Sequence, residues 1–406
     1  MSRGDDGFFS VLTPPGRGGI AVLRIVGSVA ARALETAFRP AGRGNDGNLK
    51  SPDSASSTTL LPEPGRLAYG HIIDGEGAPL DEIILYRADP EVFEVNCHGG
   101  PAAVEAVCRR LAGLGLEKVS PDRLLELEGA GRIERDARRM LRAARTPLAA
   151  RILLDQLNGA LERAVEEVCK SSASGRADEA SARLDALLNR WRCCGRLLAR
   201  PARIAIAGLP NVGKSTLVNR LLGTDRVITS EAPGTTRDYV EAEAALSGLP
   251  VVLVDTAGLR ETEEMIEREG VERARREAGA AEVVVYLLDA SEGLRAEEGA
   301  MLASLGERGL AVWNKADLAG GPLGEPGAIA ISALTGDGID ALTQALLNRL
   351  GYRPGEPGEA VPFTSVQAET FEAAREALAA GRTKGALETL GKLTNTSSSG
   401  DRCPAT

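Results

Sequence analysis

The sequence predicts a multidomain protein of mixed α/β and α+β class, in which a doubly wound sheet follows a smaller α+β domain and a helical region. Three observations support this fold class. A chain of 406 residues is longer than one hydrophobic core usually organises. From about residue 118 to 200, the apolar spacing is almost wholly the three-four spacing of helices. Beyond Arg203, apolar runs of strand length alternate with helical segments, which is typical of a mostly parallel sheet.

Residues 1–117 read as the small α+β domain. The strand-like runs GIAVLRIVG, RLAYGHIID, EIILYRAD and EVFEVNCHGG accompany two helical runs, AARALETAF, which Pro40 closes, and AAVEAVCRRLAGLG. Residues 41–65, between them, consist largely of Gly, Ser, Asn, Asp and Pro. Because such a segment has little to bury, we expect a disordered insertion there.

The remaining chain divides into three parts. Residues 118–200 form the first part of a helical domain, with SSASGRAD, at 171–178, as a loop. Residues 201–350 contain the doubly wound domain, with the strand runs RIAIAG, VVLVD, EVVVYLLD, LAVWN and AIAIS. Residues 351–406 give a linker, RPGEPGEAVP, then two short helices of the helical domain and a disordered tail.

Charge and composition limit the partners and the compartment. The net charge of -9 repels a polyanion at long range, so indiscriminate nucleic-acid binding is not expected. Seven arginines between Arg132 and Arg151 form either a local basic surface or an ordinary solvated helix face. Six cysteines without paired C-x-x-C spacing argue against a disulfide framework or a zinc site. With no secretory or bilayer-spanning apolar run, we expect a cytoplasmic protein with no membrane association.

The stretch GLPNVGKST, residues 208–216, lies between the strand run RIAIA and the helical run TLVNRLL. It satisfies G-x-x-x-x-G-K-[ST] in the strand-loop-helix setting that a phosphate-binding loop requires. Gly208 and Gly213 let backbone amides converge on phosphates at the helix N-terminus. Lys214 would neutralise the β and γ oxygens, and Ser215 would offer its hydroxyl to Mg2+.

The phosphate loop alone suits ATP or GTP, so the choice of base rests on two later segments. Asn314-Lys315-Ala316-Asp317 follows the strand run LAVW, at the edge where doubly wound sheets bind ligands. A carboxylate there can accept hydrogen bonds from guanine N1 and the 2-amino group, a donor pair that adenine lacks. Ser332-Ala333-Leu334 follows AIAI and would back the base with a backbone amide. The predicted nucleotide is therefore GTP.

Two further segments predict a nucleotide-dependent switch. Asp255-Thr256-Ala257-Gly258 ends the strand run VVLV, which puts a carboxylate near Mg2+ and a glycine amide near the γ-phosphate. Gly234-Thr235-Thr236-Arg237-Asp238 precedes it, so Thr236 can complete the Mg2+ shell only with the γ-phosphate present. The predicted GTP-contacting residues are Asn211, Val212, Gly213, Lys214, Ser215, Thr216, Ser230, Glu231, Ala232, Pro233, Gly234, Thr235, Thr236, Asp255, Thr256, Ala257, Gly258, Asn314, Lys315, Ala316, Asp317, Ser332, Ala333 and Leu334.

Leu259 occupies the position where many GTPases carry a water-orienting glutamine. Leucine cannot hydrogen-bond water, so hydrolysis is either very slow or assisted by a group from elsewhere. The acidic run RETEEMIEREG supplies carboxylates on the same segment.

Several of these segments together resemble one family. GLPNVGKST, APGTTRD, DTAGLRETEEMIEREGVERA and NKADL are similar to the potassium-dependent tRNA modification GTPases of the MnmE (TrmE) family. In the N-terminal part, TPPGRGGIAVLRIVG, YGHIID and VNCHGGPAAVEAV resemble that family in the same order. The resemblance implies a folate-binding-like N-terminal α+β domain that also dimerises, a helical domain, and an inserted P-loop GTPase domain of Ras-like fold.

For the GTPase domain, the resemblance implies a K+ ion that takes the place of an arginine finger. Glu267 falls where the family keeps a glutamate that orients water, so Glu267 and Lys214 are the implied catalytic residues. Two GTPase domains would meet face to face, which implies a homodimer. The implied K+ ligands are Asn211, Ser230, Ala232 and Thr235.

For the N-terminal domain, the resemblance implies binding of 5-formyl-tetrahydrofolate, with Arg24, Glu94 and Arg132 at matching positions. Family members act with an FAD-containing partner to add a carboxymethylaminomethyl group at C5 of the wobble uridine of certain tRNAs. We therefore expect tRNA and an FAD-containing, MnmG-like protein as partners.

The chain departs from the family pattern on the folate and modification side. No TGED stretch precedes VNCHGG, the helical pattern is reduced to GAGRIERDARRM, and the sequence stops at GDRCPAT without a Cys-x-Gly-Lys ending. Cys403 is therefore not assigned the role of the cysteine in that ending. An alternative hypothesis is a GTP-dependent regulatory or assembly switch that has lost the one-carbon tRNA chemistry.

Overall fold

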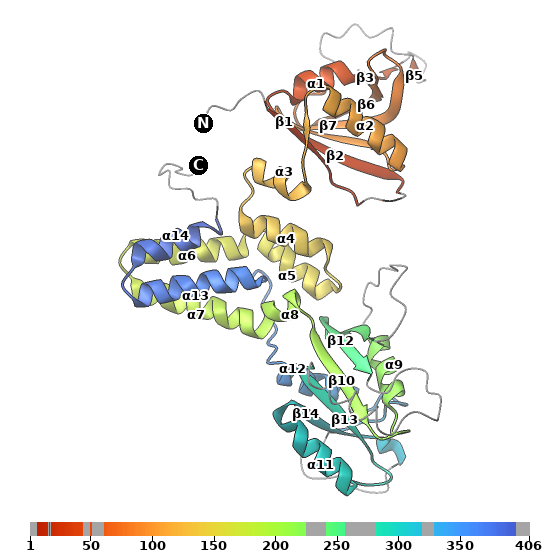
Figure 1. Ribbon diagram of the computed structural model, residues 1–406, viewed down its shortest axis with the longest axis vertical. Helices are drawn as coiled ribbons and strands as arrows, with labels where there is room; N and C mark the ends of the chain where they lie inside the picture. The colour runs from red at the N-terminus through yellow and green to blue at the C-terminus, as the bar shows by residue number, and fades with distance from the viewer. Residues whose placement is uncertain are drawn as a thin grey trace. The chain divides into compact units, whose positions relative to one another are not determined.

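The computed structural model describes residues 6–14, 16, 18–43, 49–50, 61–224, 241–255, 281–318 and 329–394. The chain forms two compact units, Met1–Ala130 and Gly131–Thr406 (Figure 1). The first unit continues past residue 117, because strand β9 (Glu117–Lys118) pairs with the first strand of its sheet and helix α3 (Pro121–Leu127) follows. The helical and doubly wound parts both belong to the second unit.

The N-terminal unit is built on a seven-stranded sheet of order β3-β6-β7-β8-β2-β1-β9. Its neighbouring strands are antiparallel, apart from the parallel pair β1 and β9. The remaining strands are β1 (Gly7–Val11), β2 (Ile20–Gly27), β3 (Phe38–Pro40), β6 (Arg66–Ile73), β7 (Pro79–Asp89) and β8 (Val92–His98).

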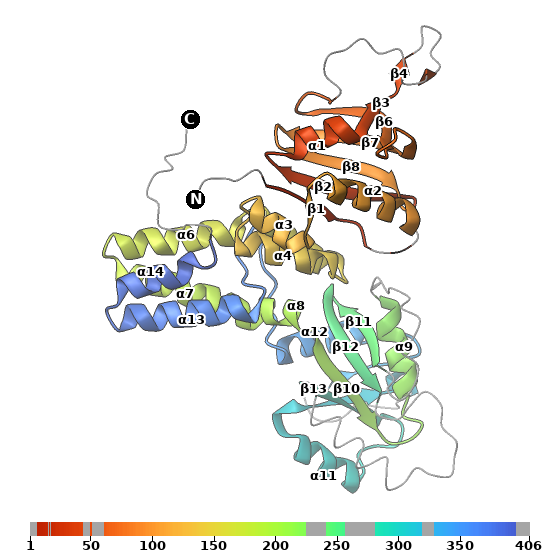
Figure 2. The same ribbon diagram turned by 45° about the horizontal axis from the view of Figure 1, so that its top comes forward.

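Helices α1 (Ala30–Ala37) and α2 (Pro101–Gly113) cover one face of this sheet (Figure 2). Because successive strand residues face opposite sides, β2 alternates buried and partly exposed positions. Leu23 of β2 lies fully buried with Leu34 of α1 and Leu111 of α2. The opposite side of the sheet carries the more exposed positions of each strand.

The helix predicted at AARALETAF is shorter than expected. α1 ends at Ala37, and Phe38–Pro40 become β3. Phe38 is fully buried and pairs with Ile72 of β6. At that point, burial of an aromatic side chain in the sheet outweighs the helical spacing.

The predicted disordered insertion, residues 41–65, is described only in part. Strands β4 (Gly42–Arg43) and β5 (Leu49–Lys50) pair within it, and Leu61 is buried in the core of the N-terminal unit. The rest of the prediction for this insertion lies outside the described residues, as does the predicted tail beyond residue 394.

Six helices of the second unit lie together (Figures 1 and 2) and share one core. Segments far apart in the sequence pack together there, since Phe371 of α13 lies in the same cluster as Leu184 of α7 and Leu390 of α14. The helices concerned are α4 (Arg132–Arg142), α5 (Pro147–Leu157), α6 (Ala160–Ala173), α7 (Ala177–Arg190), α13 (Ser365–Ala379) and α14 (Thr383–Gly391).

The loop predicted at residues 171–178 is wrong over most of its length. α6 continues to Ala173, with Ser171 and Ser172 both buried in its last turn, and α7 already begins at Ala177. Only three residues connect the two helices, and Gly175 turns the chain there with a φ of 76°.

The doubly wound part contains a six-stranded sheet of order β11-β12-β10-β13-β14-β15. Its strands are parallel except for β11, which pairs antiparallel with β12 in a hairpin that the sequence analysis did not predict. The strands are β10 (Ala202–Gly208), β11 (Glu241–Leu246), β12 (Leu249–Asp255), β13 (Val283–Asp289), β14 (Gly309–Asn314) and β15 (Ile329–Ala330).

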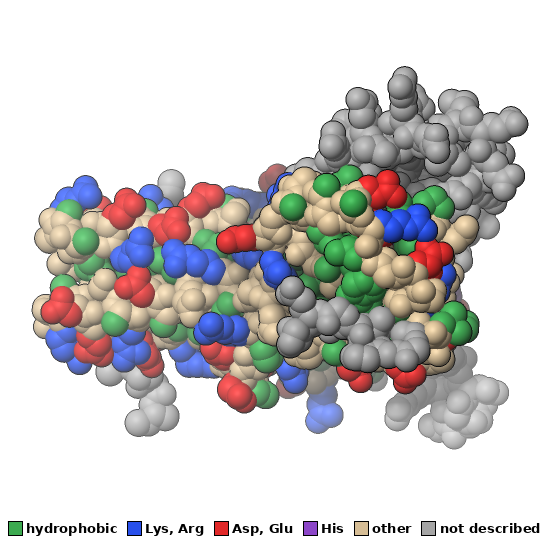
Figure 3. Space-filling view, turned by 90° about the horizontal axis from the view of Figure 1, so that it is seen from below, with side chains coloured by type: hydrophobic (Ala, Val, Ile, Leu, Met, Phe, Trp, Pro, Cys, Tyr) green, Lys and Arg blue, Asp and Glu red, His purple; other side chains and the backbone are tan. Residues whose placement is uncertain are grey.

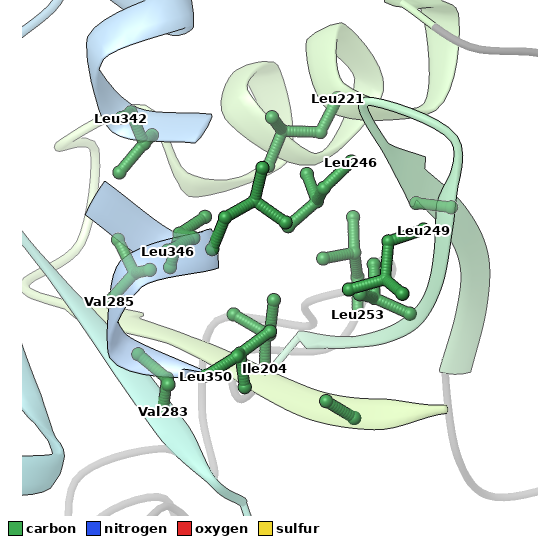
Figure 4. Packing of buried hydrophobic residues seen from close by; sticks show 14 of the residues in the cluster. Ile204, Leu221, Leu246, Leu249, Leu253, Val283, Val285, Leu342, Leu346 and Leu350 are labelled. Atoms are coloured by element: carbon green, nitrogen blue, oxygen red, sulfur yellow. The ribbon is translucent and has the colours of Figure 1, made fainter. Parts of the chain in front are cut away.

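Helices lie on both faces of this sheet. Helices α9 (Lys214–Thr224) and α12 (Ile339–Arg349) pack on one face, where Leu221 and Leu346 meet the strand residue Ile204 (Figure 4). Helix α11 (Ala296–Leu305) packs on the other face, against β13 and β14. Helices on both faces of a mostly parallel sheet confirm the predicted doubly wound architecture.

Two chain crossings join the helical and doubly wound parts. The outgoing chain passes through a π-helical turn, Trp191–Gly195, and a short helix α8 (Arg196–Ala199). The returning chain packs against it, with the amide of Arg353 donating to the carbonyl of Cys193 at 3.1 Å. Gly195 is required at this crossing, because a Cβ there would overlap the carbonyl of Pro362.

Candidate nucleotide-binding site

The phosphate loop spans the gap between the end of β10 at Gly208 and the start of α9 at Lys214. Gly208 and Gly213 have φ values of 142° and 96°. A Cβ on Gly208 would lie 2.5 Å from the carbonyl oxygen of Leu287, and one on Gly213 would overlap the side-chain amide of Asn314. Both positions therefore need glycine for conformation and for space.

Lys214 folds back over this loop. Its Nζ donates hydrogen bonds to the carbonyl oxygens of Leu209 at 2.9 Å and Gly208 at 3.2 Å. Ser215 and Thr216 are exposed in the first turn of α9. The N-terminal turn of an eleven-residue helix starts here beside a cation, which is the arrangement that binds phosphate.

Asn314, the last residue of β14, connects three separate segments. Its Nδ2 donates a 2.7 Å hydrogen bond to the carbonyl of Val212 in the phosphate loop. Its Oδ1 accepts a 2.9 Å hydrogen bond from the amide of Ala333. With only 3% of Asn314 exposed, these bonds form away from water and hold the loop and the turn after β15 in fixed positions.

Lys315 and Asp289 form an ion pair beside the loop, which sequence reasoning missed. Lys315 has a φ of 64°, and its Nζ lies 2.6 Å from Oδ2 of Asp289. Burial acts to raise the pKa of Asp289, but hydrogen bonds from Lys315 and Ser291 outweigh it and hold the pKa below its ordinary value. The only sequence signal was an aspartate closing the buried run EVVVYLLD.

The turn after β15 carries the predicted base-backing residues. Ser332 is fully buried, and its Oγ accepts a 3.1 Å hydrogen bond from the amide of Thr335. Leu334 is 73% exposed. Asp317, in the short 3-10 turn after Lys315, is also exposed. Asp317 and this turn both lie in the part of the chain that the structure describes. Their contacts with a base stay predictions.

A cavity of about 340 Å³ adjoins the loop at the carboxyl ends of β10, β13 and β14. This is the edge at which open α/β sheets bind ligands. The two basic side chains of the cavity pair with two of the three acidic ones, Lys315 with Asp289 and Arg295 with Glu292, while Glu298 accepts a hydrogen bond from the backbone amide of Arg295. The lining residues are Leu209, Pro210, Asn211, Val212, Asp289, Glu292, Gly293, Arg295, Glu298 and Lys315.

Part of the predicted site lies outside the described residues. Asp255 ends β12 level with Ile206 of the central strand, but nothing is described of its side chain. The other predicted site residues outside the described ranges are Ser230, Glu231, Ala232, Pro233, Gly234, Thr235, Thr236, Thr256, Ala257, Gly258 and Glu267.

Arg24 and Glu94, two of the predicted folate ligands, lie opposite each other on β2 and β8. The Nη1 of Arg24 is 2.5 Å from Oε1 of Glu94, and its Nη2 is 2.7 Å from Oε1 of Glu128. Burial acts to lower the pKa of Arg24, but hydrogen bonds to Glu128 and Glu94 raise it above its ordinary value. Arg24 is thus a fixed, fully charged group held by two carboxylates.

Arg132, the third predicted folate ligand, begins α4 in the second unit. Its Nε lies 3.8 Å from Oδ2 of Asp136, and Arg138 and Arg139 pair with acidic neighbours on the same helix. Acidic and basic side chains also alternate over the helical part on the face in Figure 3. These pairs favour the solvated-face interpretation of the arginine-rich segment over a basic surface.

Cys97 and His98 point to opposite sides of β8, as expected for neighbours on a strand. Cys97 is 2% exposed, and burial raises the pKa of its thiol to about 11, so it is no nucleophile at neutral pH. The Nδ1 of His98 lies 2.6 Å from Oδ1 of Asp81, and this hydrogen bond raises the pKa of the largely exposed imidazole.

Two further observations come from the described parts of the chain. No group of three or more His, Cys, Asp or Glu side chains there is arranged to hold a metal ion. No helix there is both long and apolar enough to cross a membrane.

Comparison with known proteins follows the same division of the chain. A family model described as the N-terminus of the GTP-binding protein TrmE matches residues 8–121. A second model, described as a 50S ribosome-binding GTPase, matches residues 203–315, which include the phosphate loop and Asn314.

Whole-chain relatives agree with these matches. The tRNA modification GTPase MnmE of Parasynechococcus marenigrum is 35% identical over 374 residues, covering 83% of this chain and 80% of the relative. The MnmE of Synechococcus sp. strain CC9605 is 34% identical, covering 90% and 86%. That of Thermus thermophilus is 36% identical over 411 residues, covering 92% and 88%. The chain therefore belongs to the MnmE family of tRNA modification GTPases and is a GTP-hydrolysing enzyme.

Proposed function

We propose that this GTPase takes part in tRNA modification as a K+- and Mg2+-dependent enzyme acting with an FAD-containing, MnmG-like partner. The reaction would add a carboxymethylaminomethyl group at C5 of the wobble uridine of certain tRNAs. Membership of a family whose relatives are named tRNA modification GTPases supports the coarse role. The finer steps rest on the residues of this chain and on the family pattern.

The observation that most supports a nucleotide site is the pair of hydrogen bonds by which Asn314 connects Val212 and Ala333. It joins the loop that would bind phosphates to the turn that would face the base. Asp317 would accept hydrogen bonds from guanine N1 and the 2-amino group. A nucleotide held at both ends is thereby bound by groups whose spacing is already fixed.

The phosphate end fits a nucleoside triphosphate with Mg2+. At Gly213 the loop has no room for a Cβ. The Nζ of Lys214 donates to two carbonyl oxygens of the loop, and phosphate oxygens would replace these carbonyl groups as its acceptors. Ser215 and Thr236 would bind Mg2+, which supplies positive charge to the terminal phosphates. Mutation of Ser215 to Ala should weaken GTP binding more with Mg2+ than with EDTA, and equal weakening would remove Ser215 from this role.

K+ dependence rests on Asn211 together with Ser230, Ala232 and Thr235. Asn211 is exposed in the loop between β10 and α9 and has a left-handed φ of 62°. Glu267 would orient water in place of the glutamine that Leu259 replaces. GTP turnover measured in KCl and in NaCl tests the proposal, because equal rates would exclude a K+ requirement.

The same proposal includes a homodimer whose GTPase domains meet during turnover, and a cytoplasmic location. Sedimentation of the full chain with GDP and with a transition-state analogue tests the dimer. A monomer under both conditions would contradict it.

For the N-terminal unit, we propose binding of 5-formyl-tetrahydrofolate through Arg24 and Glu94. Arg132 belongs to the second unit, so its contact with the folate stays a prediction. The charged guanidinium of Arg24 is suited to an anionic ligand. In the structure it forms ion pairs with Glu94 and Glu128. These ion pairs also favour the alternative function, a GTP-dependent regulatory or assembly switch without one-carbon chemistry. Titrating 5-formyl-tetrahydrofolate against the full chain separates the two, because only the first requires saturable binding that Arg24→Met abolishes.

Complementation of a strain that lacks its own modification GTPase tests the whole assignment. The proposal requires restored wobble-uridine modification, measured by nucleoside analysis of the tRNA. Expression without restored modification, from a chain that still hydrolyses GTP, would favour the alternative function.

A further inference from the structure

Arg220 connects the phosphate-loop helix to the turn that follows β15. From α9, its Nε donates a 3.2 Å hydrogen bond to the carbonyl oxygen of Ala333. Its Nη2 donates a second hydrogen bond to the carbonyl oxygen of Leu334. One guanidinium thus holds two successive carbonyl groups, which suits the rigid fork of arginine better than the single ammonium of lysine.

The first of these bonds fixes the direction of one backbone amide. In a trans peptide, the C=O group and the following N–H group point in opposite directions. Because Arg220 holds the carbonyl of Ala333, the N–H of Leu334 must point away from Arg220. The amides on either side have other partners, since Ala333 donates to Asn314 and Thr335 donates to Ser332. Among the described residues, the N–H of Leu334 has no backbone acceptor.

We propose that Arg220 is a positioning residue for guanine recognition, which holds the Leu334 N–H in place to donate to the O6 atom of guanine. The inference rests on the proposed function, in which Asp317 binds the opposite edge of the same base. Guanine presents an acceptor at position 6, whereas adenine presents an amino group there. A Leu334 N–H held toward position 6 therefore favours binding of guanine over adenine. If the peptide that carries this N–H could rotate, the preference for guanine would be smaller.

The test measures the Kd values of GDP, IDP and ADP for the full-length chain and its variants. Arg220→Met should raise the Kd of GDP and of IDP about tenfold, the effect of one hydrogen bond, and leave that of ADP unchanged. Arg220→Lys should give an intermediate loss. Because both GDP and IDP carry O6, their Kd ratio, which reports the 2-amino group, should stay constant.

Arg349→Met is the matched control. Arg349, on α12, also donates to a backbone carbonyl, that of Glu307, but takes no part in the base turn. It should leave all three Kd values unchanged. Thermal unfolding of both variants separates a loss of stability from a loss of base discrimination.

Each outcome decides between the possibilities. If the parent chain prefers GDP to ADP and Arg220→Met keeps the full preference, Arg220 has only a structural role and the inference is overturned. If the parent chain shows no preference, the proposed base site is wrong and the inference falls with it. Should Arg220→Met fail to fold, Arg220→Lys decides, since the inference requires a smaller preference for GDP over ADP in that variant.

Discussion

The side-chain amide of Asn314 donates a 2.7 Å hydrogen bond to the carbonyl oxygen of Val212, across 102 positions of the sequence. Through this bond the end of β14 sets the position of the phosphate loop. The same amide leaves no room for a side chain at Gly213. Asn314 therefore connects the predicted phosphate-binding loop to the turn that is predicted to face the base.

Replacement of Asn314 by Ala should weaken both nucleotide binding and folding. It leaves the carbonyl of Val212 and the amide of Ala333 buried without partners, at a cost of about 1–3 kcal/mol in the free energy of unfolding. Chemical denaturation and GDP titration measure the two effects. Asn348→Ala, at an exposed position of α12, is the control and should change neither. Wild-type values for Asn314→Ala would contradict the bridge.

Gly213→Ala should destabilise the protein, whereas Gly223→Ala should not. At Gly213, the left-handed φ of 96° and the contact with Asn314 cost roughly 1–3 kcal/mol and should abolish GTP binding. Gly223, exposed within α9, has no atom within 4 Å of the place where a methyl group would lie, so alanine there should be neutral or stabilise by up to about 1 kcal/mol. Equal loss of stability in both variants would show that the tight approach at Gly213 is not real.

The Lys315–Asp289 pair should make stability depend on acid pH. Because the folded pKa of Asp289 is lowered, its contribution is present above the unfolded pKa of about 3.9 and is lost as the pH falls through the folded pKa. Asp289→Asn should therefore lower the free energy of unfolding at pH 7, and the difference from wild type should shrink toward pH 3. A difference that stays constant over this range would exclude the charged pair as its cause.

His98 should titrate above the ordinary histidine pKa of 6.5. The hydrogen bond to Asp81 raises the pKa, so the pair contributes stability fully below about pH 6.5 and loses that contribution as the pH rises through the folded pKa. NMR titration measures this directly, since the chain has only two histidines and His71→Gln assigns the signals. Asp81→Asn should lower the pKa of His98, and an unchanged pKa in that variant would remove Asp81 as the cause.

Much of the fold followed from local sequence patterns. The run RIAIAG, followed by GLPNVGKST, predicted a strand, a loop and a helix, and the structure has β10, the loop and α9 at those positions. Apolar periodicity and the φ preference of glycine are local properties, so they can be read from neighbouring residues. Local patterns were wrong at Phe38, which is buried in a sheet, and at Ser171 and Ser172, which belong to the last turn of α6 and not to a loop.

The candidate site divides in the same way. The sequence by itself determined which segments are candidates for a nucleotide site and what chemistry they predict, because the phosphate loop and the segments around Asn314 and Ser332 each carry a residue pattern with a physical meaning. Only the tertiary structure decided which of these groups touch. The pairing of Asp289 with Lys315, the two carboxylates around Arg24 and the hold of Arg220 on the base turn all join residues at least 26 positions apart. Such contacts depend on strand order and helix packing, which no short stretch of sequence encodes.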